Sequence, residues 1–267
     1  MKTNDIEEKT IFEPDDFLER FMEKPQKMLA KAFYYPNGLN YPFHHHIPIQ
    51  FLYASQGVVK VTTEAGIWVV PNNRAVWIPS NIFHKIEATG VLAMRNIYFK
   101  PNHFSKFPDQ CCVVTVTPLL KELIKHATEI TPDYVENSPE ARVMDVIVDN
   151  LKTLDTTPLL LPAPWDNRLL KITNSFAENP SDNRTLASWG KVVGASERTL
   201  ARLFVKETGM TFRQWRQQAK LIEALSLLAQ GMAVKEVAFD VGYESVSAFI
   251  YMFRKSLGCT PGQFFNS

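Results

Sequence analysis

The residues LASWGKVVGASERTLARLF (186–204) predict two short helices joined by a sharp turn. Gly194 can adopt the left-handed backbone conformation that such a turn needs, and Ser196 is placed to cap the second helix. Leu200, Leu203 and Phe204 recur on one side of that helix, which predicts that they face inward. The pattern therefore predicts a helix-turn-helix unit whose second helix has an exposed outer face.

A second stretch, VAFDVGYESVSAFIYMFRK at residues 237–255, repeats this pattern. Gly242 corresponds to Gly194 at the turn, and Phe253 corresponds to Phe204 in the predicted core. A single match of this kind is explained equally well by a pair of helices that merely pack together. Two matches at corresponding positions favour a repeated helix-turn-helix unit.

Both units direct polar side chains outward from their second helix. In the first unit these include two arginines, which can bond bidentately to guanine in a major groove or neutralise phosphate. The helix that begins near Thr211 and joins the units also starts with donors suited to phosphate oxygens. The second unit carries little charge, so we expect the first to contribute more base recognition. The candidate DNA-binding residues are Ser196, Glu197, Arg198, Thr199 and Arg202, then Arg213, Gln214 and Arg216, and then Ser245, Val246, Ser247, Ile250, Tyr251 and Arg254.

The C-terminal part, residues 165–267, resembles the AraC/XylS family of transcription regulators. The motifs that carry the resemblance are ERTLARLF (197–204), ETG (207–209) and GYESVSAF (242–249) continuing to GCTP (258–261).

This resemblance implies two helix-turn-helix subdomains linked by one helix, with recognition helices that enter adjacent major grooves. The recognition helices would be Ser196–Phe204 and Ser245–Phe253. Tyr251 departs from the family pattern, since many members carry an arginine there. The resemblance therefore gives no support to a specific base contact at this position.

The composition is that of a soluble globular protein, since 45% of the 267 residues are hydrophobic, 21% are charged and the net charge is +1. The charge is unevenly divided: residues 165–267 hold 13 basic and 9 acidic side chains, whereas the preceding part is net acidic. The three cysteines form no disulfide framework, and neither a signal peptide nor a membrane span is recognisable. These features predict a cytoplasmic protein with no membrane partner.

The N-terminal part is expected to be rich in strands. Short alternating apolar runs between turn residues predict many strands in residues 31–115, as in a sandwich or a small barrel, and the histidine motif described below favours the barrel. Apolar residues at three- and four-residue spacing predict two amphipathic helices in residues 116–155. We therefore expect an α+β protein with an N-terminal extension (1–30), a β-barrel sensor domain (31–115), connecting helices (116–155), a proline-rich linker (156–164) and an all-α DNA-binding domain (165–267).

Three histidines and one glutamine form a candidate metal site in the predicted barrel. On a strand, His44 and His46 point to the same face, and Gln50 returns to that face if the strand continues. His84 would complete the set, while His45 would point to the opposite face and be exposed. Such a set suits a divalent transition metal with imidazole as the main ligand.

The spacing around these histidines resembles the two cupin motifs, with matches at Gly38, His44, His46, Gln50 and Gly57 and at Pro79 and His84. Gln50 stands where cupin enzymes usually have glutamate, and Asn81 stands where they have glycine. The resemblance implies a cupin-like barrel that binds Zn, Ni or Fe, with lower affinity than a site that has the glutamate.

A cupin-type sensor ahead of the DNA-binding domain is the layout of many AraC-type regulators, and the N-terminal half looks closest to the NimR-like subgroup. A different interpretation of the histidines stays open at this point. They would line a ligand pocket, or pack against Trp68 and Trp77, without holding a metal.

Together these patterns predict a sequence-specific transcription regulator whose barrel senses a small molecule or a metal. Its partners would be double-stranded promoter DNA, the effector and, in an activator, RNA polymerase. The apolar faces within residues 116–155 predict either homodimer contacts or packing within the domain. No catalytic residues are predicted, because no acid or base partner is evident beside the histidines.

The rival hypothesis is a metal-dependent cupin enzyme, a dioxygenase or an isomerase, with an accessory helical domain. It requires a tightly held metal and turnover that is lost when His44 is replaced by alanine.

Overall fold

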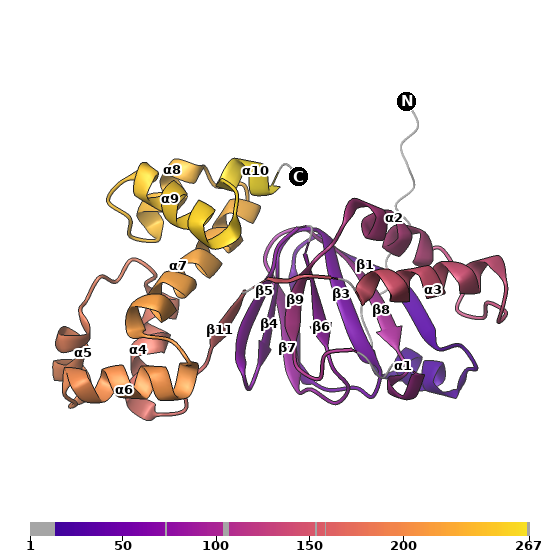
Figure 1. The fold of residues 1–267 in the computed structure, drawn as a ribbon, viewed down its shortest axis with the longest axis horizontal. Coiled ribbons are helices and arrows are strands. Elements are labelled where there is room, and N and C mark those ends of the chain that lie inside the picture. Colours follow the sequence, from indigo (N-terminus) through magenta and orange to yellow (C-terminus); the bar gives the residue numbers. More distant parts are fainter. Residues whose placement is uncertain (1–13, 73, 104–106, 153, 158, 266–267) are drawn as a thin grey trace. The chain divides into compact units, whose positions relative to one another are not determined.

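The computed structural model describes residues 14–72, 74–103, 107–152, 154–157 and 159–265 (Figure 1). Residues 1–13, which form part of the predicted N-terminal extension, lie outside the described residues. The chain forms two compact units. Unit 1 comprises Met1–Val59 and Asn72–Pro158, and unit 2 comprises Lys60–Pro71 and Leu159–Ser267. Within the described ranges, no helix combines the length and the apolar character needed to cross a membrane.

Unit 1 is built on an antiparallel sheet of six strands in the order β1-β8-β3-β6-β9-β10. Successive side chains of strand β3 (Ile49–Gln56) alternate between the two faces of the sheet, so that Phe51 and Tyr53 lie on one face and Gln50 and Leu52 on the other. The strands are β1 (Met28–Tyr35), β3 (Ile49–Gln56), β6 (Arg74–Ile78), β8 (Leu92–Phe99), β9 (Cys112–Thr115) and β10 (Thr156–Thr157). A short helical turn, η1 (Pro101–His103), follows β8, and α1 (Pro14–Glu23) packs beside β1 and β8.

Two helices, α2 (Pro118–Ala127) and α3 (Pro139–Leu151), cover the Phe51 face of this sheet (Figure 1). Each has a proline in its first turn and an N-terminal cap, and Ile124 and Ile147 lie in one core with Phe51. The two predicted amphipathic helices are thus confirmed. Packing within unit 1 accounts for their buried faces.

The remaining strands of unit 1, β2 (Leu39–His44) and β7 (His84–Ala88), pair with each other outside the six-stranded sheet. The strands of the described residues therefore belong to two sheets, as in a cupin-type sandwich, and they do not form the single closed barrel that the sequence suggested. The chain leaves β2 at His44 and enters β3 at Ile49. Pro48 has no N–H to continue a strand ladder, which explains why the strand does not run on to Gln50.

Unit 2 combines all but the first residue of β4 (Val59–Thr63) with β5 (Gly66–Val70), β11 (Leu160–Pro162) and a set of helices. β11 pairs antiparallel with β5, so part of the stretch predicted as a linker is a strand. Trp215 Nε1 donates to the Pro162 carbonyl oxygen at 2.9 Å, which ties the helices to β11. The helices are α4 (Asn167–Glu178), α5 (Leu186–Val193), α6 (Glu197–Thr208), α7 (Phe212–Ala229), α8 (Val234–Asp240), α9 (Val246–Leu257) and α10 (Pro261–Phe265).

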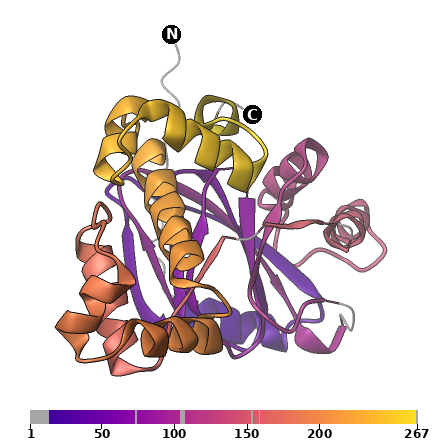
Figure 2. The ribbon, with the colours of Figure 1, turned by 60° about the vertical axis from the view of Figure 1, so that its left-hand side comes forward.

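The helices of unit 2 form two helix-turn-helix units joined by α7, the long helix visible in Figure 2. Helices α4, α5 and α6 lie at one end of α7, and α8, α9 and α10 lie at the other (Figures 1 and 2). Of the residues predicted to face inward in the first helix-turn-helix unit, Leu200 and Phe204 are buried and pack with Trp189 and Trp215, and Leu203 is half-buried against the same core.

A glycine with positive φ forms the turn of each helix-turn-helix unit. Gly194 has a φ of 68° and ends α5, and the Thr199 N–H donates to Ser196 Oγ at 3.1 Å to cap α6. Gly242 has a φ of 74° and precedes the cap of α9, Ser245. The turn and the cap predicted for the first unit are confirmed, and the second unit repeats them.

Candidate metal centre and DNA-binding helices

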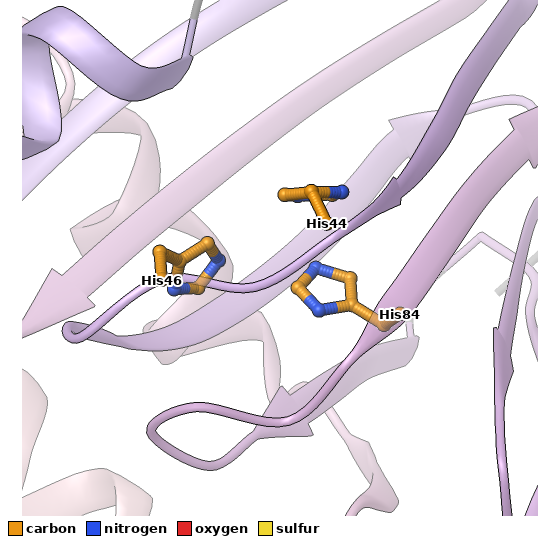
Figure 3. Close-up of side chains that lie close together, drawn as sticks. All are labelled: His44, His46 and His84. Atoms are coloured by element: carbon orange, nitrogen blue, oxygen red, sulfur yellow. The ribbon is translucent and has the colours of Figure 1, made fainter.

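His44, His46 and His84 lie together in unit 1, and their rings point toward one another (Figure 3). His44 ends β2, His46 lies in the loop that follows, and His84 begins β7 directly opposite His44. One ring nitrogen from each histidine lies within 4.8 Å of the others. The sequence prediction that these three side chains share one site is consistent with this placement, and the exposed position of His45 also agrees with it.

Backbone carbonyls hold all three rings through Nδ1. The acceptors lie two residues away in the chain: Pro42 at 3.0 Å for His44, Pro48 at 2.7 Å for His46 and Ile82 at 2.8 Å for His84. A carbonyl oxygen only accepts, so Nδ1 must carry the proton in each case. In a neutral imidazole, Nε2 then carries a lone pair. This is the tautomer that a histidine has when it binds a metal through Nε2.

Burial keeps two of these imidazoles neutral. It lowers the pKa of His84 to about 3, with a further contribution from the neighbouring His44. Burial also lowers the pKa of His46, although the oxygens of Pro48 and Gln50, which would accept from the protonated ring, oppose this effect. Desolvation penalises the imidazolium form. The Nε2 lone pairs of His46 and His84 are therefore available to a metal at neutral pH.

Gln50 lies beside this cluster, although β3 and not an extended β2 brings it there. Its side chain is fully buried, and Oε1 lies 3.1 Å from His46 Nε2. Since His46 Nδ1 holds the proton, these two atoms are both acceptors, and they repel unless a cation lies between them or the amide is turned. Adjacent ligand atoms of one metal ion face each other in this way. The side-chain amide of Gln50 therefore lies where the fourth ligand of the predicted set would be.

The structure adds neighbours that the sequence did not single out. Asn96 is fully buried on β8 and donates from Nδ2 to the Tyr98 hydroxyl at 2.8 Å. The Tyr98 ring centroid lies 6.0 Å from that of His46. Their positions on the Gln50 face of β8 follow from strand pairing, which the sequence alone did not specify.

Asn81 supports the loop of His46. Its φ is 60°, in the left-handed region that asparagine tolerates better than most residues, and its N–H donates to the His46 carbonyl oxygen at 2.9 Å. Asparagine can therefore stand where the cupin motif has glycine.

Packing against Trp77 is ruled out as an explanation of the histidines. Trp77 stacks on Phe107 at 4.5 Å between ring centroids, and its Nε1 donates to the Pro108 carbonyl oxygen. It belongs to the core beneath α2 and α3, on the opposite face of the sheet from Gln50.

The predicted DNA-binding residues of α6 lie at its N-terminal end. Glu197, Arg198 and Arg202 are exposed. Ser196 is exposed and Thr199 half-buried, and their side-chain oxygens lie 2.9 Å apart at the cap. The arginines therefore have their side chains in solvent, whereas the two hydroxyl residues also stabilise the start of the helix.

The predicted residues of α9 show the same arrangement with less charge. Ser247, Tyr251 and Arg254 are exposed, Tyr251 at 70%. Val246 and Ile250 are half-buried, and Ser245 caps the helix. This outer face offers hydroxyl and apolar groups, with a single arginine near its end.

At the start of α7, Arg213 and Gln214 are exposed and Arg216 is half-buried. The Gln214 amide oxygen accepts from the Thr211 N–H at 2.9 Å in a capping box. Arg216 donates from Nη1 to the Arg184 carbonyl oxygen at 3.3 Å. Gln214 and Arg216 therefore have structural roles that the sequence pattern did not reveal.

Two family models match the chain. The model described as "Helix-turn-helix domain" covers residues 189–267, and the "AraC-like ligand binding domain" covers residues 29–134. The chain is 36% identical over 226 residues to the HTH-type transcriptional regulator NimR of Escherichia coli (strain K12), which is 85% of this chain and 82% of that protein. It is also 36% identical over 104 residues to the HTH-type transcriptional regulator RipA of Corynebacterium glutamicum, which is 39% of this chain and 31% of that protein. Among solved structures, ToxT of Vibrio cholerae bound to an unsaturated fatty acid aligns over 91% of this chain and 96% of its own, with 12% identity and a TM-score of 0.38.

Proposed function

Because this chain belongs to the AraC family of transcription regulators, with a ligand-binding domain followed by a helix-turn-helix DNA-binding domain, we propose that α6 and α9 are its recognition helices. The observation that carries this proposal is the repeated geometry of the two units. In each, a left-handed glycine and a serine cap present a helix whose outer face is solvent-exposed. A helix of this size fits the major groove of B-DNA.

The two recognition helices would occupy adjacent major grooves, because α7 connects their units directly. Arg198 and Arg202 would contact bases or phosphates from α6, and Arg213 would bind the phosphate backbone of the DNA. The surplus of basic residues in 165–267 supports this assignment. Promoter DNA in the cytoplasm would be the target.

We propose further that the ligand-binding domain holds a divalent transition metal (Zn, Ni or Fe), either as the effector itself or as the anchor of a small-molecule effector. The ligands would be Nε2 of His44, His46 and His84 and Oε1 of Gln50. Three observations support this: the ring nitrogens converge, their Nδ1 atoms are already bonded to carbonyls, and the Gln50 side-chain amide lies 3.1 Å from His46 Nε2.

A second copy of the chain and, in an activator, RNA polymerase are further proposed partners. Leu119 on α2 and Val146 on α3 are exposed apolar residues that would meet the second copy. A cupin enzyme remains the rival. The relatives NimR and RipA are transcription regulators, and among the residues that the structure describes the histidine group contains no carboxylate that would act as acid or base.

The test of the recognition-helix proposal is selection of genomic fragments by the purified full-length protein, followed by titration of the best fragment at several salt concentrations. We expect affinity to fall steeply with salt and the selected fragments to share a site that spans about two turns of the major groove. If no fragment is enriched, either alone or with added Zn, Ni or Fe, the proposal is wrong.

The metal proposal predicts that His84→Ala removes the site. With Co²⁺ as a probe, the wild-type protein should bind one ion per chain and develop visible absorption. His84→Ala should weaken this binding by at least about 100-fold, the upper end of what loss of an outer-shell hydrogen bond costs a metal site. His45→Ala is the matched control, since His45 is adjacent in sequence and exposed. Equal Co²⁺ binding by the two variants would contradict the assignment.

A further inference from the structure

Lys220 lies on α7, where the two helix-turn-helix units meet inside unit 2. Its side chain is buried, with only 6% of the residue exposed. Nζ donates to Oδ1 of Asn183 at 3.1 Å and to the carbonyl oxygen of Gly242 at 3.2 Å. It also lies 5.4 Å from the centroid of the Tyr243 ring. The one ammonium group of Lys220 thus donates to a residue of each helix-turn-helix unit.

The two acceptors belong to segments that position the helices of each unit. Asn183 lies in the loop that directly precedes α5, and Gly242 is the turn residue between α8 and α9. The loop and the turn are in direct contact, since a Cβ built on Gly242 would lie 2.8 Å from Cα of Ser181. Lys220 therefore forms its hydrogen bonds where the first helix-turn-helix unit contacts the second.

A charged lysine at this position lowers the stability of the fold, because its ammonium group is buried. Burial and, to a lesser extent, the neighbouring Arg216 lower the pKa of Lys220 to about 8, although Asp182 opposes them. A methionine of similar length would fill the same space without burying a charge. Apolar contacts are non-directional, whereas hydrogen bonds constrain the direction of their partners. The ammonium group therefore contributes orientation that an apolar side chain would not.

We propose that Lys220 is a positioning residue that fixes α6 relative to α9 and so sets the spacing between half-sites that the protein accepts. The proposal rests on the proposed function, because it requires both helices to enter major grooves. Inserting one base pair between half-sites moves one of them by about 3.4 Å and rotates it by roughly 35°. A rigid pair of recognition helices cannot follow this change, whereas a pair freed from Lys220 can.

The experiment measures the affinity of the full-length protein for the selected operator and for versions with one or two base pairs inserted between the half-sites. The wild-type protein should lose about tenfold or more in affinity per insertion, as for a mismatched site. The Lys220→Met variant should lose less than about threefold in affinity per inserted base pair. Lys220→Arg keeps N–H donors and should restore part of the wild-type dependence. Lys171→Met, at an exposed lysine of α4, is the control and should behave as the wild type.

Binding to single half-sites at low salt shows whether both units of the variant are folded, because low salt strengthens weak binding. We expect Lys220→Met to bind each half-site as the wild type does. If it loses this binding, Lys220 is only structural and the proposal is overturned. Equal spacing dependence in Lys220→Met and the wild type overturns it as well. Absence of operator binding by the wild type would overturn the proposed function, and this proposal with it.

Discussion

Replacement of both Arg198 and Arg202 with alanine is expected to weaken operator binding by about 2 to 6 kcal/mol, since a specific arginine contact contributes roughly 1 to 3 kcal/mol. Both side chains are exposed on the N-terminal half of α6, the part of a recognition helix that contacts base edges. Neither belongs to the core of the first unit, so the fold should be retained. Fluorescence anisotropy titrations with the selected operator measure the effect.

The two single variants distinguish the roles of the arginines. Loss of a base contact relaxes sequence preference at one position, whereas loss of a phosphate contact weakens binding to all sequences and lowers the salt slope by about one. Lys121→Ala/Arg142→Ala removes the same charge from exposed positions of α2 and α3 and controls for net charge. Unchanged affinity and unchanged sequence preference in the α6 double variant would show that α6 is not a recognition helix.

Gly242→Ala is expected to lower the free energy of unfolding of unit 2 by about 2 to 5 kcal/mol. The left-handed conformation at φ 74° costs an alanine about 1 to 2 kcal/mol. The added Cβ would also lie 2.8 Å from Cα and 2.9 Å from the carbonyl oxygen of Ser181, and overpacking of this kind costs about 1 to 3 kcal/mol. Denaturant unfolding measures the loss, and DNA binding should fall with it.

Gly209→Ala separates the two contributions. Gly209 has a φ of 69°, close to that of Gly242, but a Cβ built there meets nothing within 4 Å. This variant should therefore show only the conformational cost. If Gly242→Ala is no less stable than Gly209→Ala, the close contact between the turn and the loop at Ser181 does not contribute to stability.

Much of the helical half could be predicted from sequence, because its signals are local. Gly194 and Ser196 act on the backbone within a few residues, and the inward face of α6 follows from helical spacing. The repetition of this pattern around Gly242 was a second, independent indication of helix-turn-helix units. The same reasoning placed α2 and α3, whose caps and apolar faces are also local features.

The candidate metal site was predicted partly for the wrong structural reason. A single continuous strand was expected to carry His44, His46 and Gln50, but His46 lies in a loop and Gln50 belongs to the other sheet. The residues still lie together because the loop returns the chain directly to β3. Asn96 and Tyr98 could not have been found in this way, since their position depends on the pairing of β8 with β3, which involves residues far apart in the chain.

Close contacts between backbones were also invisible in the sequence. Gly190 looks like an ordinary residue within α5, yet a Cβ there would lie 2.4 Å from the Ala195 carbonyl oxygen. The contacts of Lys220 with Asn183 and Gly242 are similar, since they join segments that only the folded structure brings together. Hydrophobic periodicity indicates that a residue faces inward but does not identify its partner.

The pairing of β11 with β5 makes unit 2 discontinuous in the chain, and this affects how a DNA-binding fragment can be prepared. A truncated protein that begins at Trp165 would lose the Pro162 carbonyl that accepts from Trp215, together with the strand that carries it. Even a fragment that begins at Leu159 would lack residues 60–71, which belong to the same compact unit. In the fragment that begins at Trp165, the core that contains Leu169 and Trp215 would also lose Leu161, which packs against it, and the exposed apolar surface would favour aggregation. The helical domain is therefore best studied within the intact polypeptide.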